Sequence, residues 1–548
     1  MGALTGYRYD FKSLRASPFG TFARSSSSVL RKKEITMTIT TNRRKFLGAA
    51  AAGVLTGATA LTAEAACKDP MPAKFDEMHD VLVVGSGFAG LAAALSAKLA
   101  GADVLVVEKM AFIGGNSSLS GGMIAVPNSS VQHDQGIVDK PEALEADMMR
   151  IGQGLGNPEH IRFLCEDAAD TFEWTRKEMN VKWQTNLTGK GGHSALRCMI
   201  TEEGTGQGII KPAVERLKTL GVEIRRRTIL DTIIRDEDGR VKGIVVREGY
   251  EFGKPDSGKR RTIGARRGVV LAFGGFCADV NYRRRLDPKL GAQYKTTNQP
   301  GATSEGWREA SRIGANIIQA DWIQCLPNCS PVEEGMGIAS HFASISGALF
   351  GIYVSSLDGK RFVNEFGDRK VLTDSFLTVI NKGGKALSIA DSDGVAHLEK
   401  LRPGALEKML AAGSVKKYAD ADALAKAYGF DGKVLRSEIA RYNELLKKGR
   451  DEDFGRPFDK GAKPMNEGPY YVSEMEPKIH HAMGGMATKV DTAVEDVMTD
   501  RPIPGLFAAG ECVGGIHGAV RIGACAVLDC LVNGRKAGAM AASQKAWI

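Results

Sequence analysis

A glycine-rich stretch near the start of the first predicted strand has the residue types and spacing to bind a phosphate group. Gly85, Gly87 and Gly90 follow Asp80 and the apolar run 81–84 and open the helix-like apolar segment 91–100. The first glycine permits a tight turn, the second lets the backbone approach a pyrophosphate, and the third lets helix and strand lie close together. The N-terminus of the helix would then face the phosphates with free N–H groups and the positive end of its dipole.

An acidic residue after the next apolar run completes a nucleotide site. Residues 104–107 form a continuous apolar run, which is typical of a buried parallel strand. Glu108 follows this run about twenty residues after the glycines, where a carboxylate accepts hydrogen bonds from ribose hydroxyls. A strand, a helix and a second strand in this order predict dinucleotide binding, which the glycine motif alone would support only weakly.

Three further glycine-rich segments favour a flavin over a nicotinamide. They are 114–122, with Asn116 and Ser117 in its middle, 268–276, which ends a strand in paired glycines, and 505–511, which ends in Glu511. Several strand ends that converge on one ligand suit the long, extended FAD molecule. Ordinary turns of an α/β protein are the alternative interpretation of these glycines.

The elements that carry these loops predict an α/β fold, and the composition excludes several other classes. The chain has 65 glycines in 548 residues without a collagen-like period, and nine cysteines are too few for a disulfide scaffold. The net charge of +9 arises mostly in residues 1–48, where ten basic residues meet two acidic ones. The remainder is nearly neutral, which argues against nucleic-acid binding.

The N-terminal segment 1–65 is predicted to be a leader. Arg43-Arg44 precedes the weakly apolar run 48–63, and Ala63-Glu64-Ala65 resembles a cleavage site. This is the pattern of a twin-arginine signal, which predicts export to the periplasm as a folded protein with its cofactor. The alternative, a short membrane anchor, fits less well because the run is too short and too weakly apolar, and no stable membrane insertion is expected. Met37 is the expected start.

Three longer motifs resemble the flavoprotein subunit of the fumarate reductase and succinate dehydrogenase superfamily. They are 358–365 (DGKRFVNE), 480–485 (HHAMGG) and 510–521 (GECVGGIHGAVR). The chain is most similar to soluble periplasmic flavocytochrome fumarate and urocanate reductases, over residues 80–548. The resemblance implies a Rossmann-like FAD-binding domain in two pieces, 79–320 and 480–548, with an inserted α+β capping (clamp) domain, 321–479. Residues 432–448 within that insertion are predicted to form an amphipathic helix.

The resemblance also implies roles for individual residues. Arg369 matches an arginine that delivers a proton to the substrate carbon, and His480 and Arg521 match residues that hold the substrate carboxylate. A guanidinium offers a carboxylate bidentate geometry, whereas it is a poor general acid unless it is buried beside other cations. A structural hydrogen bond or surface charge is the alternative for each. Ala524 and Leu326 are further expected substrate contacts.

FAD is expected to bind without a covalent bond, and no metal is expected. The expected FAD contacts are Gly85, Gly87, Ala89, Gly90, Glu108, Asn116, Ser117, Gly121, Gly122, Gly274, Glu305, His481, Glu511, Ala526 and Val527. The pairs Cys325/Cys329 and Cys525/Cys530 have no recognised metal spacing and are expected to be buried thiols. The sequence has no Cys-x-x-Cys-His haem motif, which points to a separate electron donor, such as a periplasmic multihaem c-type cytochrome.

Departures from the family pattern put fumarate itself in doubt. Fumarate reducers carry His-Pro where this chain has Leu326-Pro327, and the stretch 340–348 lacks the family's Glu and Arg. His341 could replace the missing relay or be a structural histidine. Val520 replaces an Asn, and Ala524-Cys525 replaces Gly-Asn. Burying an unpaired second carboxylate against Leu326 and Ile345 would be unfavourable, so an α,β-unsaturated monocarboxylate of acrylate, methacrylate or arylacrylate type is expected.

The predicted reaction is reduction of an activated C=C bond, with hydride from flavin N5 to the β carbon and a proton from Arg369 to the α carbon. Anaerobic respiration is the expected context. Three alternatives remain: a fumarate reductase proper, an enzyme like the 3-ketosteroid dehydrogenases, and a non-catalytic flavoprotein that only shuttles electrons. The family's steroid enzymes use tyrosines where this chain has His480 and Arg521, and a shuttle would not need Arg369.

Overall fold

The computed structural model describes residues 71–548, except residue 190 and residues 459–461. The predicted leader therefore lies outside the described residues. No helix among the described residues is long and apolar enough to cross a membrane.

A large sheet of eight strands forms the centre of the first part of the fold. Its main order is β17 (Ala493–Glu495), β18 (Pro502–Ala508), β8 (Lys259–Leu271), β1 (Glu77–Val84), β2 (Val104–Val107) and β5 (Glu223–Arg225). The five strands from β18 to β5 are parallel, while β17 is antiparallel to β18. β7 (Val241–Glu248) pairs with β8 and with β6 (Thr228–Arg235), both antiparallel.

The apolar runs from which the sequence predicted strands are found in β1, β2 and β8, which are neighbours in this sheet. All of β2 and the last four residues of β1 and of β8 are buried, because other elements of the fold pack against these parts of the sheet. β18 pairs with β8 although more than 200 residues separate them in sequence. The prediction of an α/β fold with a parallel sheet is confirmed.

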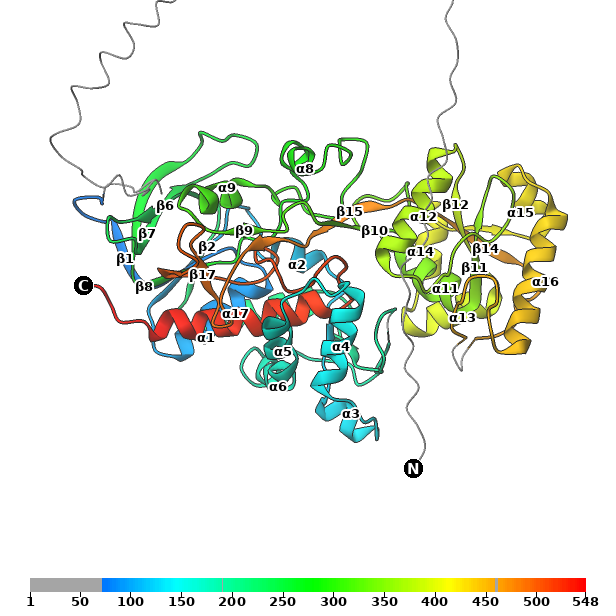
Figure 1. Cartoon of the computed structure of the whole chain (residues 1–548), viewed down its shortest axis with the longest axis horizontal. Helices are drawn as coiled ribbons and strands as arrows, with labels where there is room; N and C mark the ends of the chain where they lie inside the picture. Colours follow the sequence, from blue (N-terminus) through cyan, green and yellow to red (C-terminus); the bar gives the residue numbers. More distant parts are fainter. Residues whose placement is uncertain (1–70, 190, 459–461) are drawn as a thin grey trace, which may run out of the picture. The chain divides into compact units, whose positions relative to one another are not determined.

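Two helices from opposite ends of the described chain lie against each other (Figure 1). α1 (Phe88–Leu99) packs along α17 (Cys525–Ser543), shown in red. A Cβ at Gly534 would lie 2.5 Å from the carbonyl oxygen of Ala89, and one at Gly538 would lie 2.0 Å from that of Ala93. Only glycine permits so close an approach, and this contact joins the two ends of the sequence.

A second, antiparallel sheet is built from the middle of the chain. Its order is β11 (Gly351–Ser355), β12 (Ala386–Ala390), β14 (Tyr470–Met475) and β13 (Lys416–Tyr418). Alternate residues face opposite sides, so that Ile352 and Val354 contact α15 (Ala421–Tyr428) and α16 (Gly432–Lys448), while Tyr353 contacts α12 (Arg369–Asn381). The helix predicted over 432–448 is confirmed as α16.

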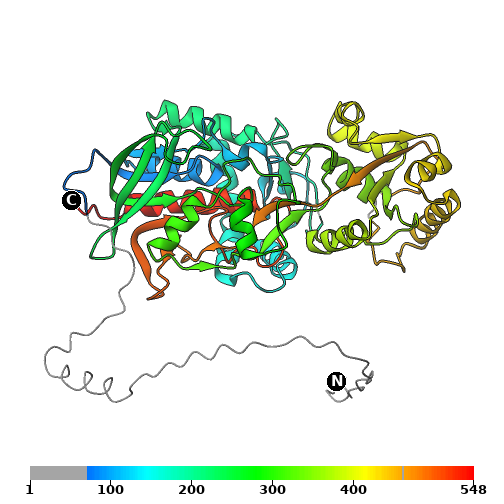
Figure 2. The ribbon, with the colours of Figure 1, turned by 90° about the horizontal axis from the view of Figure 1, so that it is seen from above.

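β10 (Ile323–Leu326) and β15 (Lys478–Ala482) pair antiparallel and run between the large sheet and the second sheet (Figures 1 and 2). A further short pair, β9 (Ile317–Ile318) and β16 (Gly485–Met486), is also antiparallel. The register of the first pair shifts between Gln324 and Cys325, because β15 contains one extra residue, His480. Such a β-bulge re-aims a side chain, and bulges are common beside active sites.

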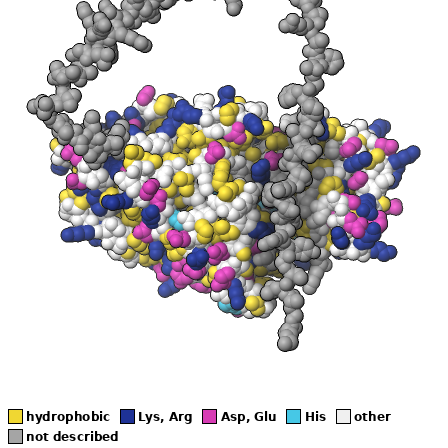
Figure 3. All heavy atoms as spheres, viewed as in Figure 1, with side chains coloured by type: hydrophobic (Ala, Val, Ile, Leu, Met, Phe, Trp, Pro, Cys, Tyr) yellow, Lys and Arg dark blue, Asp and Glu magenta, His cyan; other side chains and the backbone are white. Residues whose placement is uncertain are grey.

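The other elements surround the two sheets. Around the large sheet lie α2 (Gly115–Leu119), β3 (Met123–Ala125), α3 (Ser130–Asp134), α4 (Pro141–Ile151), α5 (Pro158–Glu166), α6 (Ala168–Lys177), β4 (Cys198–Ile200), α7 (Gln207–Thr219), α8 (Val280–Leu286) and α9 (Glu305–Arg312). Beside the second sheet lie α10 (Ala339–His341), the π-helix Phe342–Gly347, α11 (Ala348–Phe350), α13 (Ser392–Leu401) and α14 (Ala405–Ala412). On the face shown in Figure 3, basic and acidic side chains are interspersed.

Candidate active site

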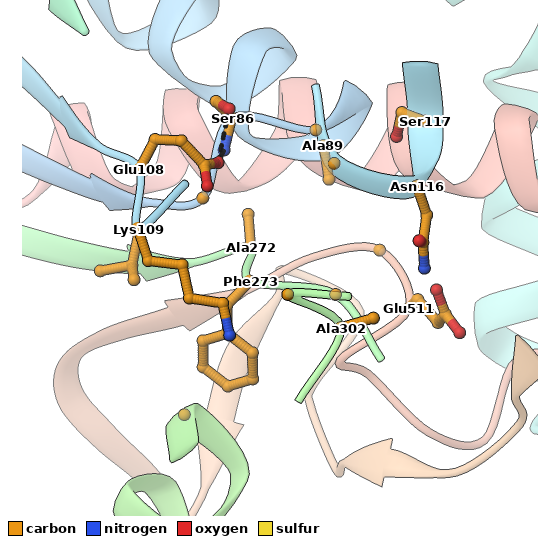
Figure 4. Close-up of a pocket in the computed structure, with 18 of the residues that line it drawn as sticks. Ser86, Ala89, Glu108, Lys109, Asn116, Ser117, Ala272, Phe273, Ala302 and Glu511 are labelled. Atoms are coloured by element: carbon orange, nitrogen blue, oxygen red, sulfur yellow. Dashed lines mark hydrogen bonds between the residues drawn. The ribbon is translucent and has the colours of Figure 1, made fainter. Parts of the chain in front are cut away.

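The carboxyl ends of the parallel strands surround a cavity that is partly open to solvent (Figure 4). Its lining includes Gly85 and Gly87 at the start of α1, Asn116 and Ser117 on α2, and Glu511 after β18. The crevice at the carboxyl ends of the strands is where open α/β sheets bind ligands.

The glycines at the start of α1 fit the requirements of a phosphate cradle. Gly85 has φ +107°, and a Cβ there would lie 2.3 Å from the carbonyl oxygen of Ala272. A Cβ at Gly90 would lie 1.9 Å from the carbonyl oxygen of Gly85, so Gly90 serves the close contact of helix and strand. The N-cap Gly87 has no side-chain cap, although Ser117 Oγ accepts a hydrogen bond from the Phe88 N–H. The N-terminal end of α1, which lines the cavity, therefore suits an anionic group.

Glu108 is held in place at the end of β2. Its Oε2 accepts hydrogen bonds from the Ser86 N–H at 3.1 Å and the Ser86 hydroxyl at 2.6 Å. Its Oε1 accepts from the Met110 N–H at 2.8 Å. These bonds orient the carboxylate at the cavity wall, and Oε1, which accepts a single hydrogen bond, keeps a further acceptor position for a ribose hydroxyl.

Another wall of the cavity comes from residues 299–306, which follow β8. Of these residues, the sequence analysis predicted only Glu305 as a contact. Lys109 donates from Nζ to Thr303 Oγ1 at 2.5 Å and to Glu305 Oε2 at 3.2 Å. Gln299 and Ala302 also line the cavity. The glycine-containing run 298–306 was the signal that could have pointed to these residues, whereas the lining residues of β6, Thr228–Leu230, carry no motif.

Glu511 lies deep in the cavity with its side chain near Asn116 (Figure 4). Its Oε1 accepts from the Ala482 N–H at 2.9 Å, and burial raises the pKa of the carboxyl to about 7. A Cβ at Gly275 would lie 2.3 Å from the same Oε1, so the paired glycines after β8 make room for this side chain. The lining thus combines a glycine cradle, an acidic ribose site and polar groups along its length, which fits FAD.

A hydrogen-bonded chain joins this cavity to the predicted substrate residues. Asn116 donates from Nδ2 to Oδ1 of Asn298 at 2.6 Å, and Asn298 donates from Nδ2 to the His480 carbonyl oxygen at 2.8 Å. Asn116 Oδ1 accepts from the Gln299 N–H at 2.9 Å. Asn298, which sequence reasoning missed, therefore links α2 to the bulge in β15.

The structure brings Arg369, His480 and Arg521 together, although 152 positions separate the first from the last. Arg369 donates from Nη1 to Gln324 Oε1 at 2.9 Å, and Gln324 donates from Nε2 to the Arg521 carbonyl oxygen at 3.3 Å. Arg521 Nη2 lies 3.3 Å from His480 Nε2. Gln324, on β10, thereby bridges the two arginines, and no motif in the sequence had indicated it.

Positive charges concentrate in this cluster. Within the described residues, neither Arg369 nor Arg521 pairs with a carboxylate. Burial, followed by the charge of Arg521, holds the pKa of Arg369 well below the ordinary arginine value. Burial likewise lowers the pKa of Arg521, and burial together with both guanidiniums holds the pKa of His480 well below its usual range. His480 is therefore neutral at pH 7, and the cluster can accept an anion.

Behind this cluster, two buried histidines lie edge to face. His481 and His517 have ring centroids 5.7 Å apart, and burial lowers the pKa of His481 well below its ordinary value. Nδ1 of His481 and Nε of Arg521 are buried without hydrogen-bond partners. Unpaired buried polar atoms are unfavourable unless a ligand completes them.

Several predicted contacts lie outside the cavity lining. Gly122 has φ +60°, and a Cβ there would lie 2.3 Å from the Thr205 carbonyl oxygen, so it serves backbone packing. Ala524 is the N-cap of α17 with φ +70°. The predicted FAD contacts that do not line the cavity are Gly90, Gly121, Gly122, His481, Ala526 and Val527.

The motif 358–365 has a structural role and stands beside the site. Arg361 donates to Glu365 Oε2 at 2.8 Å and to Asp451 Oδ2 at 2.9 Å, and all three side chains are at most 1 % exposed. Glu365 Oε1 also accepts from the Tyr353 N–H at 3.1 Å. This network anchors the loop that leads into α12, whose N-cap Asp368 precedes Arg369.

The stretch that departs from the family pattern forms the π-helix Phe342–Gly347. Ile345 contacts the hydrophobic cluster of Phe342, Val395 and Leu398, beside the second sheet. Leu326, by contrast, lies two positions after Gln324 on β10 and is only partly buried. Lys478, its partner in β15, donates from Nζ to the carbonyl oxygens of Glu333 and Gly335.

The eight described cysteines are free thiols. Cys329 and Cys525 are buried, as expected, whereas Cys325 and Cys530 are only partly buried. Burial raises the pKa of Cys325 and of Cys329 to about 12, so these thiols are protonated at neutral pH. Among the described residues no group of three or more acidic, histidine or cysteine side chains could hold a metal ion.

Comparison with known proteins adds independent information. The profile of the family described as "FAD binding domain" matches residues 80–527. The chain is 38% identical over 504 residues to an acrylate reductase flavoprotein subunit of Shewanella woodyi, covering 90% of this chain and 97% of the relative. It is 33% identical to a urocanate reductase of Eggerthella lenta, covering 85% of this chain and 74% of the relative. A flavocytochrome c3 fumarate reductase in its open conformation superposes with a TM-score of 0.68 at 29% identity, covering 93% and 82% of the two chains.

Proposed function

Because the chain belongs to the FAD binding domain family, and within it to the flavoproteins of the fumarate reductase and succinate dehydrogenase superfamily, we propose that it reduces the C=C bond of an α,β-unsaturated monocarboxylate. It is an FAD-dependent oxidoreductase. The observation that carries the proposal is the convergence of Arg369 and Arg521 on Gln324, without a carboxylate partner, beside the cavity that fits FAD.

The chain's architecture supports this assignment. We propose that the large sheet, with strands from 77–271 and 493–508, is the FAD-binding domain in two pieces. The second sheet with its helices would then be the cap, residues 321–479. Arg369 opens α12 of this cap, whereas Arg521 and His480 belong to segments next to the large sheet. A site at such a junction buries the substrate between two domains.

The residues of the cluster have distinct roles in the proposed reaction. Arg521 grips the substrate carboxylate in bidentate fashion, and His480 donates a further hydrogen bond to it. Bound FAD supplies the hydride for the β carbon. Arg369 donates a proton from its guanidinium to the α carbon, which its lowered pKa makes easier. Gln324 orients the Arg369 guanidinium through one hydrogen bond and leaves the other N–H groups of Arg369 for the substrate.

A monocarboxylate is favoured because the far end of the site offers no second cationic grip. Leu326 stands where fumarate reducers carry a histidine, and Lys478 is occupied by two carbonyl oxygens. An apolar β substituent gains about 25 cal/mol for each Å² that Leu326 and its neighbours remove from water. The similarity to the Shewanella woodyi relative, an acrylate reductase flavoprotein subunit, supports the same substrate class.

The decisive experiment compares substrates with reduced viologen as electron donor. We expect acrylate, methacrylate or an arylacrylate to exceed fumarate in kcat/KM by at least tenfold, about 1.4 kcal/mol of transition-state preference. A tenfold preference for fumarate would refute this reading of Leu326. Arg369→Ala should abolish turnover on the preferred substrate while the flavin remains bound, which separates the proton-donor role from cofactor binding.

The proposal also covers how FAD is bound, which protein donates the electrons and where the protein is exported. FAD is bound without a covalent bond, so that denaturation should release FAD into the supernatant and leave a colourless precipitate. The electrons come from a separate donor, such as a multihaem c-type cytochrome. The Arg43-Arg44 pair directs folded protein to the periplasm, and replacing both with lysine should leave precursor in the cytoplasm.

A further inference from the structure

His480 lies between two hydrogen-bonding partners that together determine which ring nitrogen carries its proton. Nδ1 lies 2.7 Å from Thr297 Oγ1, and Nε2 lies 3.3 Å from Arg521 Nη2. A guanidinium can only donate, so Nε2 must present its lone pair to Arg521. The proton of the neutral imidazole is therefore on Nδ1, which donates to the Thr297 hydroxyl.

This tautomer conflicts with the role of His480 as a donor to the substrate carboxylate. Two lone pairs, one on Nε2 and one on a carboxylate oxygen, would face each other if the proton stayed on Nδ1. The alternative of a charged imidazolium is disfavoured, because the positive charges of Arg369 and Arg521 oppose a further positive charge on this ring. A change of tautomer resolves the conflict without adding charge to the cluster.

We propose that Thr297 is a positioning residue that lets His480 change tautomer when a carboxylate binds. In the free site, Thr297 accepts from Nδ1–H and Nε2 accepts from Arg521. When a carboxylate takes the Arg521 N–H groups, the Thr297 hydroxyl turns to donate to Nδ1, and Nε2–H donates to the carboxylate. One proton leaves Nδ1 and one reaches Nε2 by exchange with water, so the net charge is unchanged. The inference rests on the proposed function, because it deepens the same site.

The surroundings of Thr297 allow its hydroxyl to take either orientation. Its Oγ1 lies 3.5 Å from the Ile479 carbonyl oxygen and accepts from Asn298 Nδ2 at 3.4 Å, and both of these bonds are long. The backbone is fixed, because the Thr297 N–H donates to the Ile479 carbonyl oxygen at 2.9 Å. A hydroxyl is donor and acceptor at once, so it can pair with either tautomer, which a fixed donor or acceptor could not do.

The neighbouring Thr296 provides a matched control. Its hydroxyl donates to the same Ile479 carbonyl oxygen at 3.0 Å and accepts from the Asn298 N–H at 3.1 Å, but no hydrogen bond joins it to His480. Thr296→Val therefore reproduces a purely local loss of a hydroxyl in this segment. Thr297→Val removes the partner of Nδ1 at nearly constant volume, and Thr297→Ser restores it.

The test measures carboxylate binding on the oxidised holoenzyme, with propionate as the probe and the flavin absorption spectrum as the readout. We expect Thr297→Val to raise the Kd for propionate about fivefold to tenfold, while Thr297→Ser and Thr296→Val stay within twofold of the wild type. In turnover with the preferred enoate, KM should rise by a similar factor, and kcat should change by less than twofold. Thr297→Ala serves as a second variant if the valine variant does not incorporate FAD.

Each outcome decides the inference. Equal Kd values for the wild type and Thr297→Val would overturn it, as would an equal loss in Thr296→Val. If propionate leaves the wild-type spectrum unchanged at saturating concentration, and the enoates are not reduced, the proposed function fails as well. If propionate binds to the wild type and Thr297→Val binds it with the same Kd, the tautomer role is wrong while the proposed function stands.

Discussion

Arg369 Nη1 donates a 2.9 Å hydrogen bond to Gln324 Oε1, and this contact joins the first residue of α12 to strand β10. The amide at the other end of Gln324 reaches the Arg521 backbone. One neutral side chain therefore links the Arg369 guanidinium to the Arg521 backbone. A neutral partner also leaves the lowered pKa of Arg369 intact, whereas a carboxylate would raise it.

Gln324→Glu should slow the reaction, because the new carboxylate pairs with Arg369, raises its pKa and makes it a weaker proton donor. We expect kcat to fall at least tenfold, about 1.4 kcal/mol, with FAD content unchanged. Steady-state assays with the preferred enoate measure this effect. Gln319→Glu is the control, since Gln319 also bridges two backbone segments, at Leu155 and Gly515, but contacts neither arginine. A kcat within twofold of the wild type would contradict the role of Gln324.

Glu365→Gln should destabilise the cap, because Glu365 pairs with Arg361 at 2.8 Å and lies 3.4 Å from Arg456 in a fully buried setting. Removing one partner of a buried ion network typically destabilises a protein by about 3–5 kcal/mol. The thermal midpoint should fall by more than about 5 °C. Asp374→Asn removes the exposed pair with Lys370 and should change the midpoint by less than about 2 °C. Similar midpoints for the two variants would show that the network contributes little.

Ala524→Gly should stabilise the protein, because Ala524 has φ +70° at the N-cap of α17, a region that L side chains rarely adopt. Relief of this strain is worth about 1 kcal/mol. Calorimetry of the holoenzyme measures the gain. Ala539→Gly, within the same helix, should instead destabilise by about 0.5–1 kcal/mol. A loss of stability in Ala524→Gly would show that the alanine methyl group is needed where it lies.

Glu511 should make stability depend on pH. Burial raises the pKa of its carboxyl to about 7, above its unfolded value, so the folded state holds this proton more tightly. The contribution is fully present below about pH 4.5 and is lost as pH rises through about 7. Across this window, the wild type should lose up to about 1.4 kcal/mol per pH unit relative to Glu511→Gln. Thermal midpoints of both proteins from pH 5 to 8 test this, and parallel curves would contradict it.

The sequence by itself determined the parallel strands and the nucleotide cradle. Gly85, Gly87 and Glu108 are separated by at most 23 positions, so their motif reflects one local strand–helix–strand unit whose geometry the glycines dictate. The continuous apolar runs, one before Gly85 and one before Glu108, form strands β1 and β2, and residues 81–84 and 104–107 are buried. The amphipathic pattern of 432–448 also predicted its helix, for equally local reasons.

Only the tertiary structure decided which distant polar residues meet. Gln324, Thr297 and Asn298 carry no motif, and their roles come from the bulge at His480 and from the approach of α12 to β10. The motif 358–365 carried part of the family resemblance, and only the structure shows that its Arg361 and Glu365 form a buried ion network. Ile345, around which the sequence predicted an apolar surface, packs against the cluster that contains Val395 and Leu398. These outcomes depend on contacts between residues far apart in sequence, and such contacts are fixed by packing of whole sheets and helices, which no local pattern encodes.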